Sequence, residues 1–224
     1  MGLLDLLLPP RCGGCGGLGA WLCPSCRSAV RAPEEPLCPR CGVELASRGA
    51  HCACRARLRA LARLRSAALY EGPLERALHR FKYEGWRPLA SPLASLLAER
   101  LAVEGLSAGA VTAVPLHPRR RRQRGYNQAD LLARELRRQL RLPGPAGALL
   151  RLRETPPQVG QDRLRRQTNV AGAFGWRGSP LAGQPLLLVD DVATTGATLE
   201  ACAAALRAAG SGPVTGFTVA RVRL

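Results

Sequence analysis

The 224-residue sequence predicts an α/β fold in which helices flank a parallel sheet, preceded by a small cysteine-rich domain. Two observations support this prediction. From Ser66 onward, short apolar runs alternate with segments of helical periodicity, as is typical of parallel strands joined by right-handed crossovers. Eight of the nine cysteines lie between Cys12 and Cys54. We therefore expect two domains, over residues 1–65 and 66–224.

The expected elements begin with an amphipathic connecting helix over 55–65, whose arginines form a solvated basic face. Strands are expected where apolar runs are short and unbroken, over 66–70, 111–114, 186–189 and 216–222. Helices are expected where apolar residues recur at helical spacing, over 74–83, 88–104, 127–140 and 198–209. Gly210 closes the last helix, and Cys202 within it is expected to be a small core residue.

The composition narrows the class of protein and of partner. Hydrophobic residues make up 46% of the chain and aromatic residues only 4%, so the core must consist mainly of Leu, Ala and Val. The formal net charge of +17 favours anionic partners, namely phosphates or nucleic acid. Lys82 is the only lysine, and an arginine-rich composition of this kind also accompanies a GC-rich genome.

The sequence predicts a cytoplasmic protein without membrane insertion. It contains no run of 18 or more apolar residues. The apolar start Met1–Leu8 carries Asp5 and lacks the basic region of a signal peptide.

The cysteines form four closely spaced pairs, which in a reducing compartment are more typical of zinc ligands than of disulfides. Taken in sequential order, they predict two structural Zn²⁺ ions, bound by Cys12, Cys15, Cys23 and Cys26 and by Cys38, Cys41, Cys52 and Cys54. A crossed, RING-like pairing is compatible with the same spacing. Because only Ala53 separates Cys52 from Cys54, His51 is an alternative ligand in the second site.

The segment Leu186–Leu199 is the most informative one for function. A buried strand leads directly into Asp190 and Asp191, which we expect just beyond its carboxyl end, where ligands bind in parallel sheets. The small residues that follow can surround a phosphate with backbone N–H groups and hydroxyls at a helix start: Ala193, Thr194, Thr195, Gly196, Ala197 and Thr198. Paired carboxylates can accept hydrogen bonds from ribose hydroxyls or hold hydrated Mg²⁺. An N-cap or a turn-forming aspartate would explain only one or two of these residues.

Two arginine-rich segments complete the expected site. The first follows the strand 111–114 and contains Leu116, His117 and the arginines from Arg119 to Arg124, which can bind a diphosphate. The second, over 151–169, contains Arg153 and is expected to form a mobile lid. A solvated loop and a disordered linker are the respective alternatives. Glu84 or Asp130 could act as a general base, but nothing in the sequence positions either of them.

The segment LLLVDDVATTGATL resembles the phosphoribosyl pyrophosphate (PRPP) motif of type I phosphoribosyltransferases. Almost the whole chain resembles the ComF family, which joins a double zinc ribbon to such a domain. The cysteine pairs also carry this resemblance, together with Phe81–Gly85, Arg124–Gln128, Thr155, Gln158 and Arg166–Val170.

This resemblance implies roles for individual residues. Asp190 and Asp191 would bind the ribose hydroxyls, and Ala193–Thr198 the 5′-phosphate. A diphosphate loop would lie near Leu116–Arg119, with a mobile loop over Arg151–Asn169. Asp190, Asp191 and Arg119 are therefore the candidate catalytic residues, and Leu116, His117 and Arg153 further candidates for PRPP binding.

The implied function is transfer of a phosphoribosyl group from PRPP, with Mg²⁺, to an unidentified acceptor. ComF members are linked to natural competence, the uptake of single-stranded DNA. The alternative is a catalytically silent PRPP sensor or adaptor that binds single-stranded DNA or competence proteins. A zinc hydrolase is disfavoured, because eight thiolates leave neither metal an open position.

Overall fold

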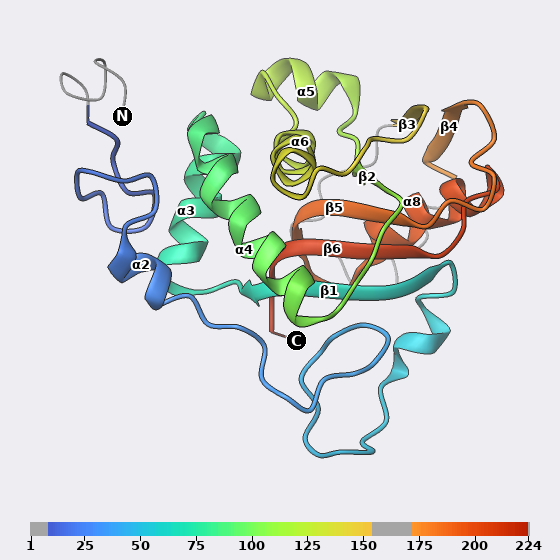
Figure 1. Ribbon diagram of the computed structural model, residues 1–224, viewed down its shortest axis with the longest axis horizontal. Helices are drawn as coiled ribbons and strands as arrows, with labels where there is room; N and C mark the ends of the chain where they lie inside the picture. The colour runs from blue at the N-terminus through green and yellow to red at the C-terminus, as the bar shows by residue number, and fades with distance from the viewer. Residues whose placement is uncertain (1–8, 154–171, 224) are drawn as a thin grey trace.

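The computed structural model describes residues 9–153 and 172–223. Its centre is a four-stranded sheet in the order β1-β6-β5-β2, in which all neighbouring strands are parallel (Figure 1). The strands are β1 (Leu61–Leu69), β2 (Ala110–Ala113), β5 (Leu186–Ala193) and β6 (Val214–Arg221). The predicted parallel sheet is thus confirmed.

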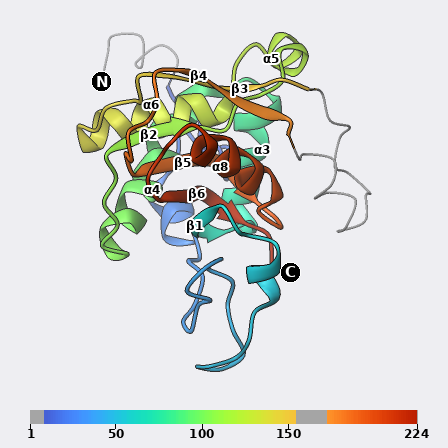
Figure 2. The same cartoon turned by 90° about the vertical axis from the view of Figure 1, so that its right-hand side faces the viewer.

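Helices cover both faces of the sheet. Alternate residues of β5 point to opposite faces and therefore pack in two different cores. Leu187 and Val189 pack among α3 (Gly72–Tyr83), α4 (Ala90–Val103) and α6 (Gln128–Leu140). Leu186 and Leu188 face α8 (Ala197–Ala208), where Cys202 is fully buried as predicted. Figure 2 shows α8 beside β5 and β6. A short 3₁₀ turn, η2 (Arg87–Leu89), precedes α4. The four helices α3, α4, α6 and α8 begin and end within three residues of their predicted bounds.

The predicted connecting helix over 55–65 is wrong. Only the 3₁₀ turn η1 (Ala53–Ala56) forms there, and β1 begins at Leu61, where Leu61 pairs with Val214 of β6. Leu61 and Leu64 are buried in the sheet, so pairing with β6 overrides the helical spacing of the apolar residues. The expected boundary between residues 65 and 66 therefore falls inside β1.

In the described part of the sheet domain, three elements were not expected from the sequence. The antiparallel pair β3 (Gly147–Arg151) and β4 (Phe174–Gly178) forms a second small sheet that packs on α8. The arginine-rich segment after β2 is not a loop but the helix α5 (Pro118–Arg124). Most of the predicted lid, including Thr155, Gln158, Arg163, Arg166 and Asn169, lies outside the described residues.

The cysteine-rich region forms two lobes at different places on the sheet domain (Figure 1). The first contains α2 (Pro24–Ser28) and packs on α3. Arg80 of α3 donates to the carbonyls of Cys12 and Gly13, at 2.9 Å each. The second lobe lies beside β1, in contact with the middle of β1 through Arg65 and with the end of β6 through Arg221. Within the described ranges, no helix is both long and apolar enough to cross a membrane.

Candidate functional site

A pocket of about 740 Å³ opens at the carboxyl ends of β2 and β5. Its walls come from α3, the turn after β2, α5, the start of α6, β3 and the β5–α8 connection. Of the predicted PRPP-binding residues, it contains Leu116, Asp190, Asp191 and the whole run from Ala193 to Thr198. It also contains polar residues that were not singled out as candidate site residues: Lys82, Tyr83, Gln123, Asn127, Gln128 and Arg151.

The two aspartates lie within β5 rather than beyond its end, because β5 continues to Ala193. Asp190 is paired in register with Thr218, and Ala193 with Arg221, so β6 extends the strand beyond the apolar run. Asp190 is half-buried and Asp191 is only 6% exposed. The Oδ1 atom of Asp191 accepts from the N–H of Val192 at 2.8 Å. The acid pair is therefore held by the regular geometry of a strand.

Lys82 lines the pocket, although the sequence analysis named it only within the segment Phe81–Gly85 and not as a candidate site residue. Its Nζ atom lies 3.0 Å from Oδ2 of Asp191, and both side chains line the pocket. The charge of Asp191 raises the pKa of Lys82, against the effect of burial. Burial and the neighbouring Asp191 raise the pKa of Asp190, which Lys82 partly opposes. Lys82 thus offsets part of the repulsion between two adjacent carboxyl groups in one pocket.

The end of α3 that carries Lys82 is fixed by the start of α6. Gln128 donates from Nε2 to the carbonyl of Lys82 at 3.1 Å, and Arg124 donates to Gln128 Oε1 at 2.8 Å. Tyr126 donates its hydroxyl to the carbonyl of Phe81, and Arg124 stacks over the ring of Tyr83. The segments 81–85 and 124–128, which the sequence resemblance had singled out separately, therefore form one wall of the pocket.

A tight turn joins β5 to α8 over Ala193–Thr198, and it is here called the phosphate loop after its predicted role. Gly196 adopts a left-handed conformation with φ of 81° and precedes the first residue of α8. The hydroxyl of Thr195 accepts from the N–H of Ala197 at 3.4 Å. The amino end of a helix with small side chains around it is well suited to an anionic group.

Only some of the other predicted residues line the pocket. Arg120 and Arg124, four residues apart on one face of α5, line the pocket, whereas Arg119 is exposed and lies outside its lining. His117 and Arg153 also lie outside the lining. Neither proposed general base reaches the pocket. Glu84 contacts His79 at 3.2 Å, and Asp130 pairs with Arg134 at 2.8 Å.

The eight cysteines form two clusters in sequential order, as predicted. In each cluster the four sulfur atoms lie within 4.8 Å of one another. The sulfur separations of 3.7 Å for Cys15–Cys23 and 3.5 Å for Cys41–Cys52 suit tetrahedral zinc, which places thiolates about 3.8 Å apart. The crossed pairing is therefore wrong, and His51 is exposed and belongs to neither cluster.

Local hydrogen bonds prepare these thiols for metal binding. The N–H of Cys23 donates to the sulfur of Cys12 at 3.3 Å. Burial raises the pKa of the thiols, but backbone N–H donors outweigh it at Cys12 and Cys38, whose pKa falls to about 6 and about 7. Both clusters are thus compatible with structural zinc.

Comparison with known proteins identifies the family. The double zinc ribbon domain matches residues 3–56. The DNA utilization protein YhgH of Escherichia coli K12 is 32% identical over 211 residues, covering 91% of this chain and 92% of that protein. Competence protein F of Haemophilus influenzae Rd is 32% identical over 210 residues, covering 89% and 90% of the two chains. The chain belongs to the ComF family. Another ComF relative, competence protein ComFC of Bacillus subtilis 168, is 29% identical over 211 residues, covering 89% and 84%.

Proposed function

We propose that this ComF-family protein binds PRPP with Mg²⁺ in the pocket and transfers the phosphoribosyl group to an acceptor. The observation that carries the proposal is the placement of Asp190, Asp191 and the phosphate loop in one pocket. The carboxylates would accept hydrogen bonds from the ribose hydroxyls, while the N–H groups of the loop bind the 5′-phosphate.

The reaction breaks the bond between the anomeric carbon and the diphosphate oxygen, and forms a bond from that carbon to the acceptor, which releases a proton. Positive charge develops on the ribose and negative charge on the leaving diphosphate. Asp190 and Asp191 would stabilise the first, and Arg120 and Arg124 are placed to neutralise the second. Mg²⁺, held by Asp190 and the oxygens of the substrate, would supply further neutralisation of the diphosphate.

Calorimetry with PRPP and Mg²⁺ tests the proposal. We expect saturable binding to the natural chain and a loss of affinity of at least about 100-fold when both Asp190 and Asp191 are changed to Asn, because two charge-assisted hydrogen-bond acceptors are lost. Asp130→Asn is the control, since Asp130 lies on α6 outside the pocket lining. Absence of saturable binding to the natural chain would overturn the proposal. If PRPP does bind, release of diphosphate in the presence of a panel of nucleobases and amines would identify the acceptor class.

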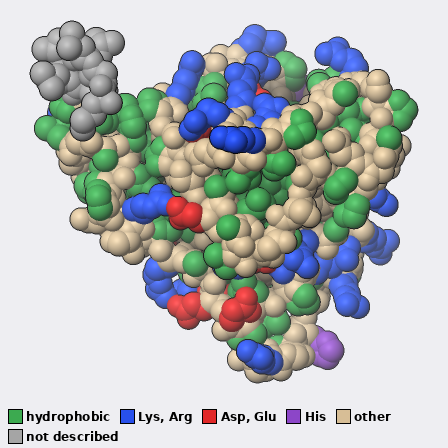
Figure 3. Space-filling model, in the orientation of Figure 1, with side chains coloured by type: hydrophobic (Ala, Val, Ile, Leu, Met, Phe, Trp, Pro, Cys, Tyr) green, Lys and Arg blue, Asp and Glu red, His purple; other side chains and the backbone are tan. Residues whose placement is uncertain are grey.

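A second candidate function is binding of single-stranded DNA, with PRPP acting as a signal. The observation that favours it is the cluster of arginines on α5, which buries none of its residues. Figure 3 shows Lys and Arg side chains gathered over this end of the molecule. The relatives named DNA utilization and competence proteins support a link with DNA uptake.

The salt dependence of DNA binding tests this candidate. If phosphate contacts dominate, the affinity for single-stranded DNA should fall steeply with salt, with a slope of about −0.7 per phosphate contact. Changing Arg121 and Arg122, which are exposed and outside the pocket lining, to Gln should reduce this slope. Filter binding or fluorescence anisotropy measures both effects. An affinity insensitive to salt would remove α5 from any role in DNA binding.

A further inference from the structure

The phosphate loop shares a buried core with the second cysteine cluster, which consists of Cys38, Cys41, Cys52 and Cys54. Cys38, Cys41 and Cys54 belong to the same buried core as Leu58, Leu64 and Ala197. A Cβ atom on Gly196 would lie 3.0 Å from Leu64 Cδ2 and 3.4 Å from Leu58 Cδ2. The chain that leaves the cluster therefore packs directly against the turn proposed to hold phosphate.

Glu200 links the phosphate loop to the chain segment that leaves the second cluster. It lies in the first turn of α8, two residues after the phosphate loop. Its Oε1 atom accepts from the N–H groups of Arg59 and Ala60, at 2.7 and 2.6 Å, and its Oε2 atom from that of Leu61, at 3.0 Å. Three successive N–H groups that enter β1 thus share one carboxylate, whose charge strengthens each hydrogen bond.

Hydrogen bonds also join the backbone just before β1 to the second cluster. Arg40, between Cys38 and Cys41, donates to the carbonyls of Leu58 and Arg59, at 2.6 and 3.2 Å. Leu58 in turn donates its N–H to the carbonyl of Cys54 at 2.8 Å. A continuous chain of contacts therefore runs from the cysteines through residues 58–61 to Glu200.

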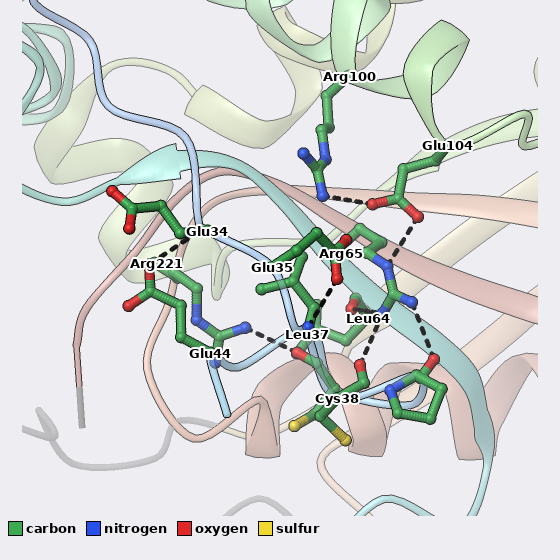
Figure 4. A network of polar contacts seen from close by, with 12 residues as sticks. Glu34, Glu35, Leu37, Cys38, Glu44, Leu64, Arg65, Arg100, Glu104 and Arg221 are labelled. Carbon is green, nitrogen blue, oxygen red and sulfur yellow. Dashed lines mark hydrogen bonds and ion pairs between the residues drawn. The ribbon is translucent and has the colours of Figure 1, made fainter. Parts of the chain in front are cut away.

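A second connection reaches the strand end of the phosphate loop. Arg221, which is 3% exposed, donates to the carbonyl of Cys41 at 2.7 Å and is paired in register with Ala193. Arg65 donates to the carbonyls of Cys38 and Pro39 and to Glu104 (Figure 4). The cluster thus supports both the start and the end of the loop.

We infer that Glu200 is a positioning residue that couples the second cysteine cluster to the phosphate loop, so that zinc in this cluster and a phosphorylated ligand in the pocket stabilise each other. This inference rests on the proposed function. The first cluster contacts α3 and is not connected to the loop by such a carboxylate among the described residues. The coupling should therefore be specific to the second cluster.

Thermodynamic linkage makes the inference measurable from either side. If zinc in the second cluster strengthens PRPP binding by a given factor, PRPP must strengthen zinc binding there by the same factor. Typical coupling between sites is about 5- to 150-fold. The readout is the release of zinc to a chelator in the presence of a thiol-alkylating reagent, with peptide mass mapping to assign each newly reactive cysteine to its cluster.

We expect saturating PRPP and Mg²⁺ to slow the alkylation of Cys38, Cys41, Cys52 and Cys54 by about tenfold, and to change that of the first cluster by less than about twofold. In Glu200→Gln, the side-chain amide has one oxygen acceptor where the carboxylate has two. Its NH₂ group would face backbone N–H groups, which cannot donate to it. The protection by PRPP should then fall to about twofold or less, and the affinity for PRPP by about tenfold.

Glu200→Asp keeps the carboxylate and should restore part of the protection, which a merely structural role in folding would not predict. Glu99→Gln is the matched control, because Glu99 pairs with Arg27 beside the first cluster. If PRPP binds to the natural chain but protects both clusters equally or neither, the inference is wrong while the proposed function stands. If PRPP does not bind at all, the proposed function fails, and the inference with it.

Discussion

Replacing Lys82 with methionine is expected to lower the free energy of unfolding by about 3 kcal/mol at neutral pH. The change leaves Asp191, which is 6% exposed, without its cation and directly beside Asp190. Removing one partner of a buried ion pair typically costs about 3–5 kcal/mol, and the partial exposure of Lys82 places this case at the lower end. Urea unfolding followed by circular dichroism measures the loss.

The pH dependence gives this prediction a second readout. Because the pKa of Asp190 is raised in the folded state, stability associated with its protonated form is lost as pH rises through that pKa. Without Lys82 the pKa of Asp190 rises further above its value of about 8, so the deficit of Lys82→Met should be larger at about pH 9 than at about pH 6. Lys82→Arg, which retains a cation, should lose less stability than Lys82→Met. Equal losses in the two variants at both pH values would show that packing, and not charge, explains the role of Lys82.

Gly196→Ala is expected to weaken PRPP binding by more than about tenfold and to cost about 2 kcal/mol of stability. A side chain at φ of 81° is strained, and its Cβ would press on Leu64 at 3.0 Å. Either the phosphate loop or the core of the second cluster must move. Calorimetry with PRPP and thermal unfolding measure the two effects separately.

Gly210→Ala is the matched control for this change. Gly210 follows the other end of α8 with φ of 84°, and a Cβ there would meet nothing within 4 Å. It should cost stability through the same backbone strain while leaving the affinity for PRPP unchanged. If both variants bind PRPP as the natural chain does, the turn at Gly196 does not form the phosphate site.

The parts of this fold that the sequence predicted are those determined by local pattern. The cysteine pairs, the apolar run of β5 and the small residues after Asp191 each indicate their structure within a few positions, because strands and metal knuckles need particular neighbours. The sequential pairing of the cysteines followed from short connections. The helices 74–83 and 127–140 followed from clear amphipathic spacing.

The remaining features depend on partners that are distant in sequence. Leu61 belongs to a strand only because Val214 lies beside it, and local spacing alone favoured a helix. Lys82 became a site residue through Asp191, on a different element, although it is the only lysine of the chain. Arg120 and not Arg119 lines the pocket, because α5 is a helix and rotates adjacent residues by about 100°.

The solitary lysine also has a chemical consequence. Reagents that attack amines and ignore guanidinium groups find one side-chain amine in the entire polypeptide, and it lines the pocket beside Asp191. Because the ion pair with Asp191 raises the pKa of this amine, a fluorophore or crosslinker with that reactivity should mark the pocket only slowly at neutral pH.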